Sequence, residues 1–487
     1  MKFGIYTKLL FIFVVLAATV YPQNISDALR LGYSGIGSSA RALGMGNSYI
    51  GLSDDASAGF FNPAGFGLLK KMEFSGGLDY SNFSNDATLN SNGSAIGQSS
   101  NNTASSTALD RVSFALPFPT VQGSLVFGLS YQNTKDFNGA LSFNGYNKNS
   151  SFIQNLPSDL LFEVGLNSAI YNAQGKITGY TPTIINGNLN QSGSILNSGG
   201  INNWTLSGAV EIYKNLFVGL NLNIISGTYE SNSDYYEDNV NNLYQGLADT
   251  SDPNTLNFKT FYLNRLTHWD ISGWDAKFGI LYQLNRFSRF GLTVQFPKTY
   301  TIKESFTVNG YGQFQNYTYP LNSSDFSDNV QYDIVTPFEI GAGFSFNIMG
   351  LILSAQGTLI DYSQLKYENP DGIAAVDIAD LNKTIKNDLT AVVNYNIGAE
   401  YTIPEVGLRV RAGFFVQPSA YKSDPTSFDK KYITAGIGFL AEEAIGLDLA
   451  FAHGWYSDIG DNYGSNVSRT TQDINENHFI LTATYRF

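Results

Sequence analysis

Apolar and polar residues alternate along many stretches of this chain. Every second residue of 479–487 is apolar, and the positions between them include Thr482, Thr484 and Arg486. A period of two places successive side chains on opposite faces of a strand. Such stretches are therefore predicted to be strands with one apolar and one polar face. The same alternation recurs at residues 216–224, 393–401 and 406–416.

The pattern predicts about 14 strands, an even number, as single-chain bacterial barrels have. They cover residues 70–82, 106–117, 122–134, 203–212, 216–229, 270–284, 288–309, 331–347, 350–365, 389–402, 405–416, 431–440, 443–456 and 476–487. Short turns are expected at residues 119–120, 213–215, 285–287, 348–350, 403–404 and 442. Long connections rich in Asn, Ser, Asp and Gly are expected at 83–105, 135–202, 230–269, 310–330, 366–388, 417–430 and 457–475.

Short and long connections thus alternate strictly along the chain. Alternation within strands alone is compatible with a soluble sandwich, whose apolar faces form the core, and with a transmembrane barrel, whose apolar faces meet lipid. A sandwich has no reason to place every long loop at one end, whereas outer-membrane barrels have short periplasmic turns and long outer loops. The fold class predicted is all-β, a transmembrane antiparallel β-barrel over residues 70–487.

Composition narrows the class of protein further. Of 487 residues, 14% are charged and 14% aromatic, and 48 are Gly. Ordinary globular domains carry about 25% charged residues, so the composition argues against a cytosolic enzyme. The net charge of −13 speaks against a nucleic-acid partner, which needs clustered Lys and Arg. With no Cys and three His, no disulfide, metal site or cofactor is predicted.

Residues 1–23 are predicted to be a signal peptide. Lys2 and Lys8 precede an apolar run at 9–20, which has signal-peptide length and is short of the about 20 residues that span a bilayer. An N-terminal membrane anchor is the alternative. No later apolar run is long enough to span, so a mature chain in a membrane must be a closed barrel, which points to the bacterial outer membrane.

The chain carries no sequence signal for catalysis. Residues 35–40 fit a G-x-G-x-x-A string, but dinucleotide binding needs a preceding strand and a crossover helix, and here the string follows a signal peptide. Neither a G-x-S-x-G nor an H-E-x-x-H string occurs. The sequence therefore predicts that the protein is not an enzyme.

The most specific sequence feature is a Gly-rich run at residues 38–65, which reads SSARALGMGNSYIGLSDDASAGFFNPAG. With its Asp-Asp-Ala-Ser step and Asn-Pro-Ala-Gly turn, it resembles the start of the FadL/TodX family of outer-membrane transporters for long-chain fatty acids and other hydrophobic compounds. Looser similarity lies at 361–363, 397–401 and 408–413. The resemblance spans most of the chain.

This resemblance implies a 14-stranded barrel whose residues 24–69 fold into the lumen as a plug. A barrel of this size has a lumen too wide for side chains alone to fill, and irregular backbone is tolerated there because protein surrounds it. The expected plug and gating residues are Asn62, Pro63, Ala64 and Gly65; the alternative is a loop turn with no role in gating. The function implied is passive transport of fatty acids first and aromatic hydrocarbons second. A PorV-like component of a protein secretion system, which shares a similar start, is the alternative.

Two sets of residues are candidates for ligand binding. Apolar residues recur at helical spacing in two outer loops, where the family first catches its ligand. From these loops the predicted ligand-binding residues are Phe162, Leu166, Tyr244, Phe261 and Leu266. Packing against each other to cap the barrel is an equal alternative. Alternation also places charged residues in the lumen, where a carboxylate ligand favours Arg409 or Arg411, although ion pairing among them is the more common arrangement.

Further partners follow from the ends and loops of the chain. The terminal Tyr485-Arg486-Phe487 closes an amphipathic strand and is similar to the signal read by the outer-membrane barrel assembly machinery. Outer-membrane lipids are expected around the barrel. Acidic loop residues Asp234, Glu237 and Asp238 are expected to be solvated, with divalent-cation binding as the alternative.

Overall fold

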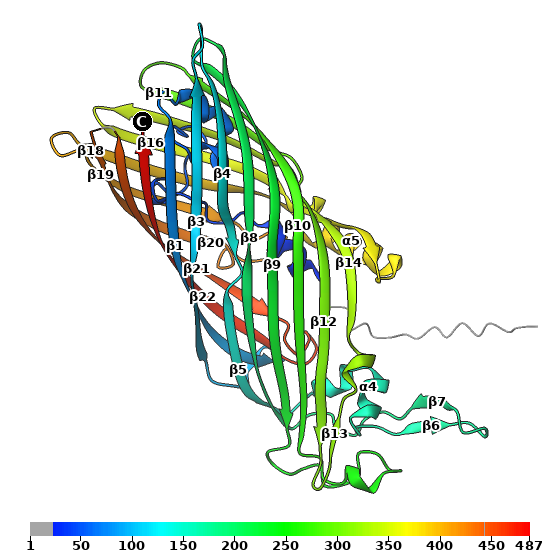
Figure 1. The fold of residues 1–487 in the computed structure, drawn as a ribbon. Coiled ribbons are helices and arrows are strands. Elements are labelled where there is room, and N and C mark those ends of the chain that lie inside the picture. The colour runs from blue at the N-terminus through cyan, green and yellow to red at the C-terminus, as the bar shows by residue number, and fades with distance from the viewer. Residues whose placement is uncertain (1–22, 443) are drawn as a thin grey trace, which may run out of the picture.

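The computed structural model describes residues 23–442 and 444–487, so of the predicted signal peptide only Gln23 lies within the described part. These residues form a closed antiparallel barrel of 14 strands (Figure 1), in which β1 pairs with both β3 and β22. The fold class predicted from the sequence is therefore confirmed.

Ten of the barrel strands are continuous, and four are each divided into two segments. In order around the barrel they are β1 (Glu73–Ser91), β3 (Ser100–Phe118), β4 (Leu125–Asp136) with β5 (Gly139–Asn147), β8 (Leu189–Tyr213), β9 (Leu216–Asp238), β10 (Thr260–Gln283), β11 (Ser288–Gln295) with β12 (Thr299–Gln313), β14 (Asp328–Val335) with β15 (Glu339–Ile348), β16 (Leu351–Asp361) with β17 (Lys366–Asp371), β18 (Ala391–Ile403), β19 (Leu408–Gln417), β20 (Lys430–Ala441), β21 (Ile445–Gly460) and β22 (Arg469–Arg486).

Two of the interruptions lie side by side and contain proline. Pro297 separates β11 from β12, and Pro337 separates β14 from β15. Proline has no N–H to give to a ladder. The backbone N–H of Thr336 nevertheless donates to the carbonyl of Lys298 at 3.0 Å, so the two strands stay joined across the break.

The remaining elements are short. Strands outside the barrel wall are β2 (Ser94–Ala95), β6 (Ala169–Tyr171), β7 (Ile177–Tyr180) and β13 (Thr318–Pro320). Helices are α1 (Ile25–Gly32), α2 (Ala40–Gly44), α3 (Ala58–Phe61), α4 (Ser158–Glu163) and α5 (Ala375–Asp388), with 3-10 turns η1 (Pro63–Leu68), η2 (Phe152–Asn155), η3 (Pro253–Thr255), η4 (Ser323–Asp325) and η5 (Tyr362–Gln364). Within the described part of the chain, none of these helices is both long and apolar enough to cross a membrane.

The two faces of the wall differ as the alternation predicts. Large apolar side chains such as Leu220, Ile224 and Trp274 point outward and are exposed. Between them, Asn221 and Asp275 point inward and are buried. An apolar outer band with a polar interior is the arrangement of a barrel in lipid.

The two ends of the barrel also differ. Figure 1 shows the short turns and the C-terminus together at one end, called here the turn end, and α4, β6, β7 and β13 at the other, called the loop end. The wall is uneven in height, because β8 has 25 residues and β10 has 24, whereas β19 has 10. The long strands project at the loop end.

Several strands are longer than the sequence predicts. Predicted strands 203–212 and 216–229 are parts of β8 and β9, which add residues 189–202 and 230–238 at the loop end. The outward side chains of these additions include Ser192 and Asn232, which are polar. Beyond the apolar band neither face needs to be apolar, so the alternation that marks a strand is lost there.

Candidate functional site

The N-terminal segment, residues 24–69, is fixed locally by side-chain caps. Asn24 and Asp27 form a capping box at the start of α1, with both hydrogen bonds at 3.1 Å. At α2, Ser39 accepts a hydrogen bond from the backbone N–H of Ala42. Such caps satisfy the free N–H groups at helix starts, so short helices keep a defined shape here.

Residues 62–65, the predicted gating turn, form the start of η1 and are buried. The Asn62 side chain accepts from the Ala64 N–H at 3.1 Å and donates to the carbonyls of Ile50 and Ile280 at 2.9 and 3.0 Å. One amide thus joins the turn to the N-terminal segment and to barrel strand β10. The structure brings these four residues together against the wall, and their role in gating stays a prediction.

Glycines on the luminal face make room for the N-terminal segment. A Cβ on Gly343 would lie 2.8 Å from the nitrogen of Gly51, and one on Gly436 would lie 3.2 Å from the Cα of Gly44. The first distance is shorter than atoms tolerate and the second is tight, so a side chain at Gly343 would force the backbones apart and one at Gly436 would need a small shift. The glycines in contact with the segment include Gly128, Gly219, Gly279, Gly291, Gly341, Gly343, Gly398, Gly413 and Gly436, in β4, β9, β10, β11, β15, β18, β19 and β20.

Arg41 of α2 joins the N-terminal segment to the wall through charge. Its Nε and Nη2 donate to the two oxygens of Glu400 in β18, both at 3.0 Å. Its Nη1 lies 2.5 Å from Asp54, whose other oxygen accepts from Arg289 of β11 at 2.9 Å. Paired guanidinium–carboxylate contacts of this kind fix geometry as well as charge. The segment is therefore held by ion pairs to two strands of the wall, β11 and β18.

The two neighbouring carboxylates of the segment stay ionised. Burial would raise the pKa of Asp54, but the charges of Arg41 and Arg289 outweigh it and hold that pKa below its ordinary value. Burial likewise opposes ionisation of Asp55, and the charges of Arg41 and Arg111 lower its pKa. Both acids therefore pair with arginine at neutral pH.

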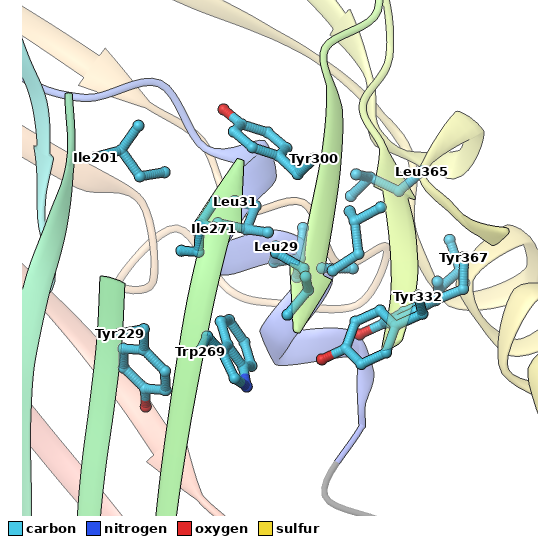
Figure 2. Packing of buried hydrophobic residues seen from close by; sticks show 14 of the residues in the cluster. Leu29, Leu31, Ile201, Tyr229, Trp269, Ile271, Tyr300, Tyr332, Leu365 and Tyr367 are labelled. Atoms are coloured by element: carbon cyan, nitrogen blue, oxygen red, sulfur yellow. The ribbon is translucent and has the colours of Figure 1, made fainter. Parts of the chain in front are cut away.

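Helix α1 is anchored by an apolar cluster. Figure 2 shows Leu29 and Leu31 of α1 among Trp269, Tyr300 and Tyr332 of the wall. The same cluster continues to Ile378 and Ile385 of α5. Burying such side chains stabilises by about 1.5–3 kcal/mol each. Helix α1, the first part of the N-terminal segment, is thus packed against the wall beside α5.

Above the N-terminal segment lies a cavity of about 630 Å³. Its lining combines apolar and aromatic side chains with charged ones. Representative members are Leu141, Tyr229, Trp269, Asp110, Lys135 and Arg265. Leu141 and Tyr235, at its outer limit, also belong to the apolar cluster of the outer loops. The cavity therefore lies between the segment and the outer loops, and its volume is in the range of ligand sites.

A second pocket, of about 470 Å³, lies in the barrel wall. Its lining residues come from strands β1, β3, β4, β8 and β9 and the link after β4. Four residues line both it and the luminal cavity: Asp79, Asn133, Asp136 and Asn138. Two register shifts flank the pocket, one between β1 and β3 and one between β4 and β8. Bulges of this kind bend strands and redirect side chains, so the wall and luminal pockets meet at a local irregularity.

The predicted ligand-binding residues of the outer loops fall into three environments. Leu166 and Phe261 are buried in the apolar cluster that caps the loop end. Tyr244 packs against that cluster, and the ring of Phe162 contacts that of Tyr180 in a tilted arrangement with centroids 5.6 Å apart. Leu266 is exposed on the outward face of β10. The structure thus brings Leu166, Phe261 and Tyr244 together and leaves Leu266 on the other side of the wall.

The helical spacing expected in the second of these loops is wrong. Residues 260–266 belong to strand β10 rather than to a helix. Phe261 and Leu263 point inward in that strand and are buried. Aromatic residues favour strands as well as buried helix faces, and a short apolar run cannot be assigned from periodicity alone.

The predicted carboxylate partners Arg409 and Arg411 lie near the turn end. Arg411 is paired with Glu400 at 2.6 Å and with Asp448 at 2.7 Å. Arg409 lines a pocket of about 20 Å³ with Arg41 and other residues. Neither arginine is among the described residues that line the large cavity. For Arg411 the ion-pair alternative matches its surroundings, and a ligand role for either stays a prediction.

Glu237, expected to be solvated, is instead fully buried at the loop end. Its carboxylate accepts hydrogen bonds from Gln191 at 2.6 Å and from the backbone N–H groups of Phe152 and Ile153 at 2.9 and 3.2 Å. Burial raises its pKa, against these hydrogen bonds. The expectation was wrong because β9 continues beyond the apolar band and turns odd-numbered residues inward.

Sequence reasoning missed the residues that hold the N-terminal segment. Arg41, Asp54 and Asp55 lie inside the run 38–65, but nothing local indicates their partner Glu400, 359 positions away. The luminal glycines carried a usable signal, because each stands at a polar-face position of a predicted strand, where a polar side chain is the rule.

Comparisons with known proteins add a family and a fold. A family model described as outer membrane protein transport protein (OMPP1/FadL/TodX) matches residues 23–487. No curated protein matches the chain. A Pseudomonas aeruginosa FadL homologue of solved structure matches with a TM-score of 0.55 and 12% identity, over 94% of this chain and 100% of its own. The P. putida toluene transporter TodX matches with a TM-score of 0.53 and 12% identity, over 93% and 99%. At this identity the two structures show a shared fold.

Proposed function

The chain belongs to the outer membrane protein transport family (OMPP1/FadL/TodX), and from that premise we propose that it carries long-chain fatty acids, and secondarily aromatic hydrocarbons, passively across the bacterial outer membrane. The family is one of outer-membrane transport proteins. The solved TodX structure is that of a toluene transporter, which supports the second ligand class. Outer-membrane barrels have their short turns in the periplasm and their long loops outside the cell. The turn end of this barrel therefore faces the periplasm, and the loop end faces the exterior.

One observation carries the proposal: the luminal cavity meets a pocket in the wall. Asp79, Asn133, Asp136 and Asn138 line both spaces, so a molecule in the lumen lies next to a path through the side of the barrel. The free energy of a hydrophobic molecule falls when it enters lipid, roughly in proportion to the apolar area that leaves water. A molecule that leaves through the wall enters the membrane, whereas one that leaves along the barrel axis enters the aqueous periplasm.

The level of the wall pocket supports this route. Leu109, Trp204 and Ile224 are exposed apolar residues on three neighbouring strands of the wall. The wall pocket begins directly beyond them, at residues 106–108 and 226–228. Leu196 of β8 is exposed still further toward the loop end, so the pocket opens between exposed apolar residues of the outer surface.

Ligand would first meet the outer loops. Val240 and Leu243 are exposed there, beside the partly buried Tyr244. Beneath them the apolar cluster continues to Leu141 and Tyr235 at the outer limit of the luminal cavity. Apolar side chains thus extend from the loop surface to the lumen, as capture of a hydrophobic ligand requires.

The N-terminal segment would act as the plug that prevents leakage of water-soluble solutes. Its backbone touches luminal glycines on strands from β9 to β20, and its charges pair with Glu400 and Arg289. Exit through the wall needs no displacement of this segment. A rearrangement at residues 62–65 would then adjust the cavity rather than open an axial channel.

This function involves passage and no catalysis. The alternative of a secretion-system component stays a prediction, and copurification of the barrel with a secretion complex would favour it. The proposal itself is tested by uptake of labelled oleate and toluene in cells with the gene deleted or restored. Restoration should raise uptake of at least one, and unchanged uptake of both would overturn the proposal.

A further inference from the structure

One arginine lies between two apolar clusters inside the barrel. Arg265 is on the luminal face of β10, between Leu263, which belongs to the loop-end cluster, and Trp269, which belongs to the cluster around α1. Its side chain lines the luminal cavity of about 630 Å³. A ligand that moves from the outer loops into the cavity therefore meets this cation with apolar surface on either side of it.

The guanidinium of Arg265 differs from the other cations of the cavity in having no acceptor. Its Nε is buried without a hydrogen-bond partner, and no carboxylate of the described residues lies within ion-pair distance of it. Four other basic side chains line the cavity, and each has an acid or a carbonyl beside it: Arg30 pairs with Asp27, Lys135 donates to the carbonyls of Arg30 and Leu31, Lys430 interacts with the charges of Asp458 and Glu476, and His478 lies 3.3 Å from Asp79.

Two aromatic rings contact this guanidinium and leave its donors unused. Its Cζ lies 5.9 Å from the ring centroids of both Phe152 and Tyr235, at the limit of about 6 Å for a cation–π contact. The five N–H donors of arginine form a planar fork that fits the two oxygens of a carboxylate. Because buried polar groups are hydrogen-bonded in about 90% of cases or more, the unpartnered Nε points to an acceptor that a ligand supplies.

The wall around Arg265 suits an anionic head group. The neighbouring residues on β9 and β10 that line the cavity include Ser233, which pairs with Arg265 across the strands, and Thr267. Their hydroxyls are further donors. The acids on the wall-pocket side of the cavity stand on other strands, with β8 and β9 between them and β10: they are Asp79, Asp110 and Asp136, on β1, β3 and β4.

We propose that Arg265 gives the transporter its preference for a carboxylate head group, by binding the carboxylate of a fatty acid whose tail lies in the luminal cavity. The inference rests on the proposed transport function and deepens it, because it assigns a residue to recognition of the first ligand class. Tyr229 and Trp269, both lining the cavity, offer apolar surface to the tail. An aromatic hydrocarbon has no acceptor for the guanidinium, so its passage depends on Arg265 far less.

Equilibrium binding to the full-length protein in nanodiscs tests this, with empty nanodiscs subtracting partition into lipid. The probes are labelled oleate and oleyl alcohol, which share one tail and differ in the head group. Wild-type protein should bind oleate at least about tenfold more tightly than oleyl alcohol, the size of effect that a charge-assisted hydrogen bond gives. Equal binding of the two probes overturns the inference.

Variants of one residue locate the effect. Arg265→Gln should weaken oleate binding by about tenfold and leave oleyl alcohol within about twofold. Arg265→Lys keeps the charge without the planar fork, so it should bind oleate more tightly than Arg265→Gln does. The matched control is Arg286→Gln, which removes an equal charge from the exposed turn between β10 and β11 and should change neither probe. Oleate binding by Arg265→Gln at wild-type strength overturns the assignment.

Uptake separates head-group recognition from packing. In cells that lack the gene and carry Arg265→Gln, the ratio of oleate uptake to toluene uptake should fall by about tenfold from its wild-type value. If both uptakes fall and the ratio is unchanged, Arg265 serves only to pack Phe152 and Tyr235, and the inference is overturned.

The outcomes also separate the two proposals. If oleate and oleyl alcohol bind equally well, the role of Arg265 fails and hydrophobic transport stands. If neither probe binds above empty nanodiscs and neither oleate nor toluene is taken up, the proposed function fails, and the inference fails with it.

Discussion

Gly343 of β15 and Gly51 of the N-terminal segment lie in direct contact, since a Cβ on Gly343 would stand 2.8 Å from the Gly51 nitrogen. Two residues further along the same luminal face, the hydroxyl of Ser345 donates to the carbonyl of Gly51 at 2.8 Å. The wall therefore holds the segment by close backbone packing and by a hydrogen bond at one point. Neither contact survives if the wall gains a side chain there.

The substitution Gly343→Val should displace the N-terminal segment, because overpacking at a tight contact costs about 1–3 kcal/mol. Conductance of the barrel in planar bilayers should rise. The matched control is Gly208→Ala, where the new Cβ would meet the ring of Phe127 at an ordinary 3.6 Å and conductance should not change. Equal conductance of the two variants would show that the segment does not depend on this contact.

The substitution Glu400→Gln should lower the free energy of unfolding by about 3–5 kcal/mol, as breaking a buried ion pair does. Glu400 pairs with both Arg41 and Arg411 and its side chain is 1% exposed. Denaturant unfolding in detergent micelles measures the change. The control is Asp461→Asn, which removes an exposed pair with Arg469 and should cost about 0–1 kcal/mol. Similar losses in both variants would contradict the role assigned to Glu400.

The N-terminal segment should release only in acid. The pKa of Asp54 is held below its ordinary value of 3.8, so its pairing contributes fully above that value and is lost as pH falls through the lowered pKa. Conductance should therefore stay low from neutral pH down to about pH 4 and rise below it. Asp54→Asn, which cannot ionise, should remove this pH dependence or raise conductance throughout. A rise of wild-type conductance near pH 6 would contradict the assignment.

Outer-loop residues should separate into structural and binding roles. Phe261 is buried in the cluster that caps the loop end, so Phe261→Ala should cost about 3–5 kcal/mol. Phe162 makes a ring contact with Tyr180 and is not fully buried. Phe162→Ala should cost less than about 1.5 kcal/mol and slow uptake of labelled oleate. If Phe162→Ala lowers the free energy of unfolding more than Phe261→Ala does, the packing assigned to the loop-end cluster is wrong.

The sequence alone predicts the barrel strands where they cross the lipid, because there the outward side chains must be apolar. Strand β22 was predicted over 476–487 because Phe479 and Leu481 must face hydrocarbon while Thr482 faces the lumen. Its residues 469–475 were missed because they extend beyond the apolar band. There, water or loops meet both faces, so alternation no longer marks a strand.

The contacts that define the site could not be predicted locally. The pairing of Arg41 with Glu400 spans 359 positions and depends on how the segment crosses the lumen. Alternation predicted that Arg411 faces inward. Ion pairing, the more common arrangement of such luminal charges, matches its contacts. Asp110 was missed because a bulge breaks the register there, and no residue type marks a bulge at that position.

Passage of ligand through the barrel wall is tested most directly by uptake of oleate and toluene. The cells lack the gene and carry wild-type protein, Ala108→Trp or Thr103→Trp. Ala108 lines the wall pocket, and Thr103 is exposed on the outer face of the same strand. If ligand leaves the lumen through the wall, wild type and Thr103→Trp restore uptake, whereas Ala108→Trp does not. Uptake by Ala108→Trp at the wild-type rate would contradict passage through the wall.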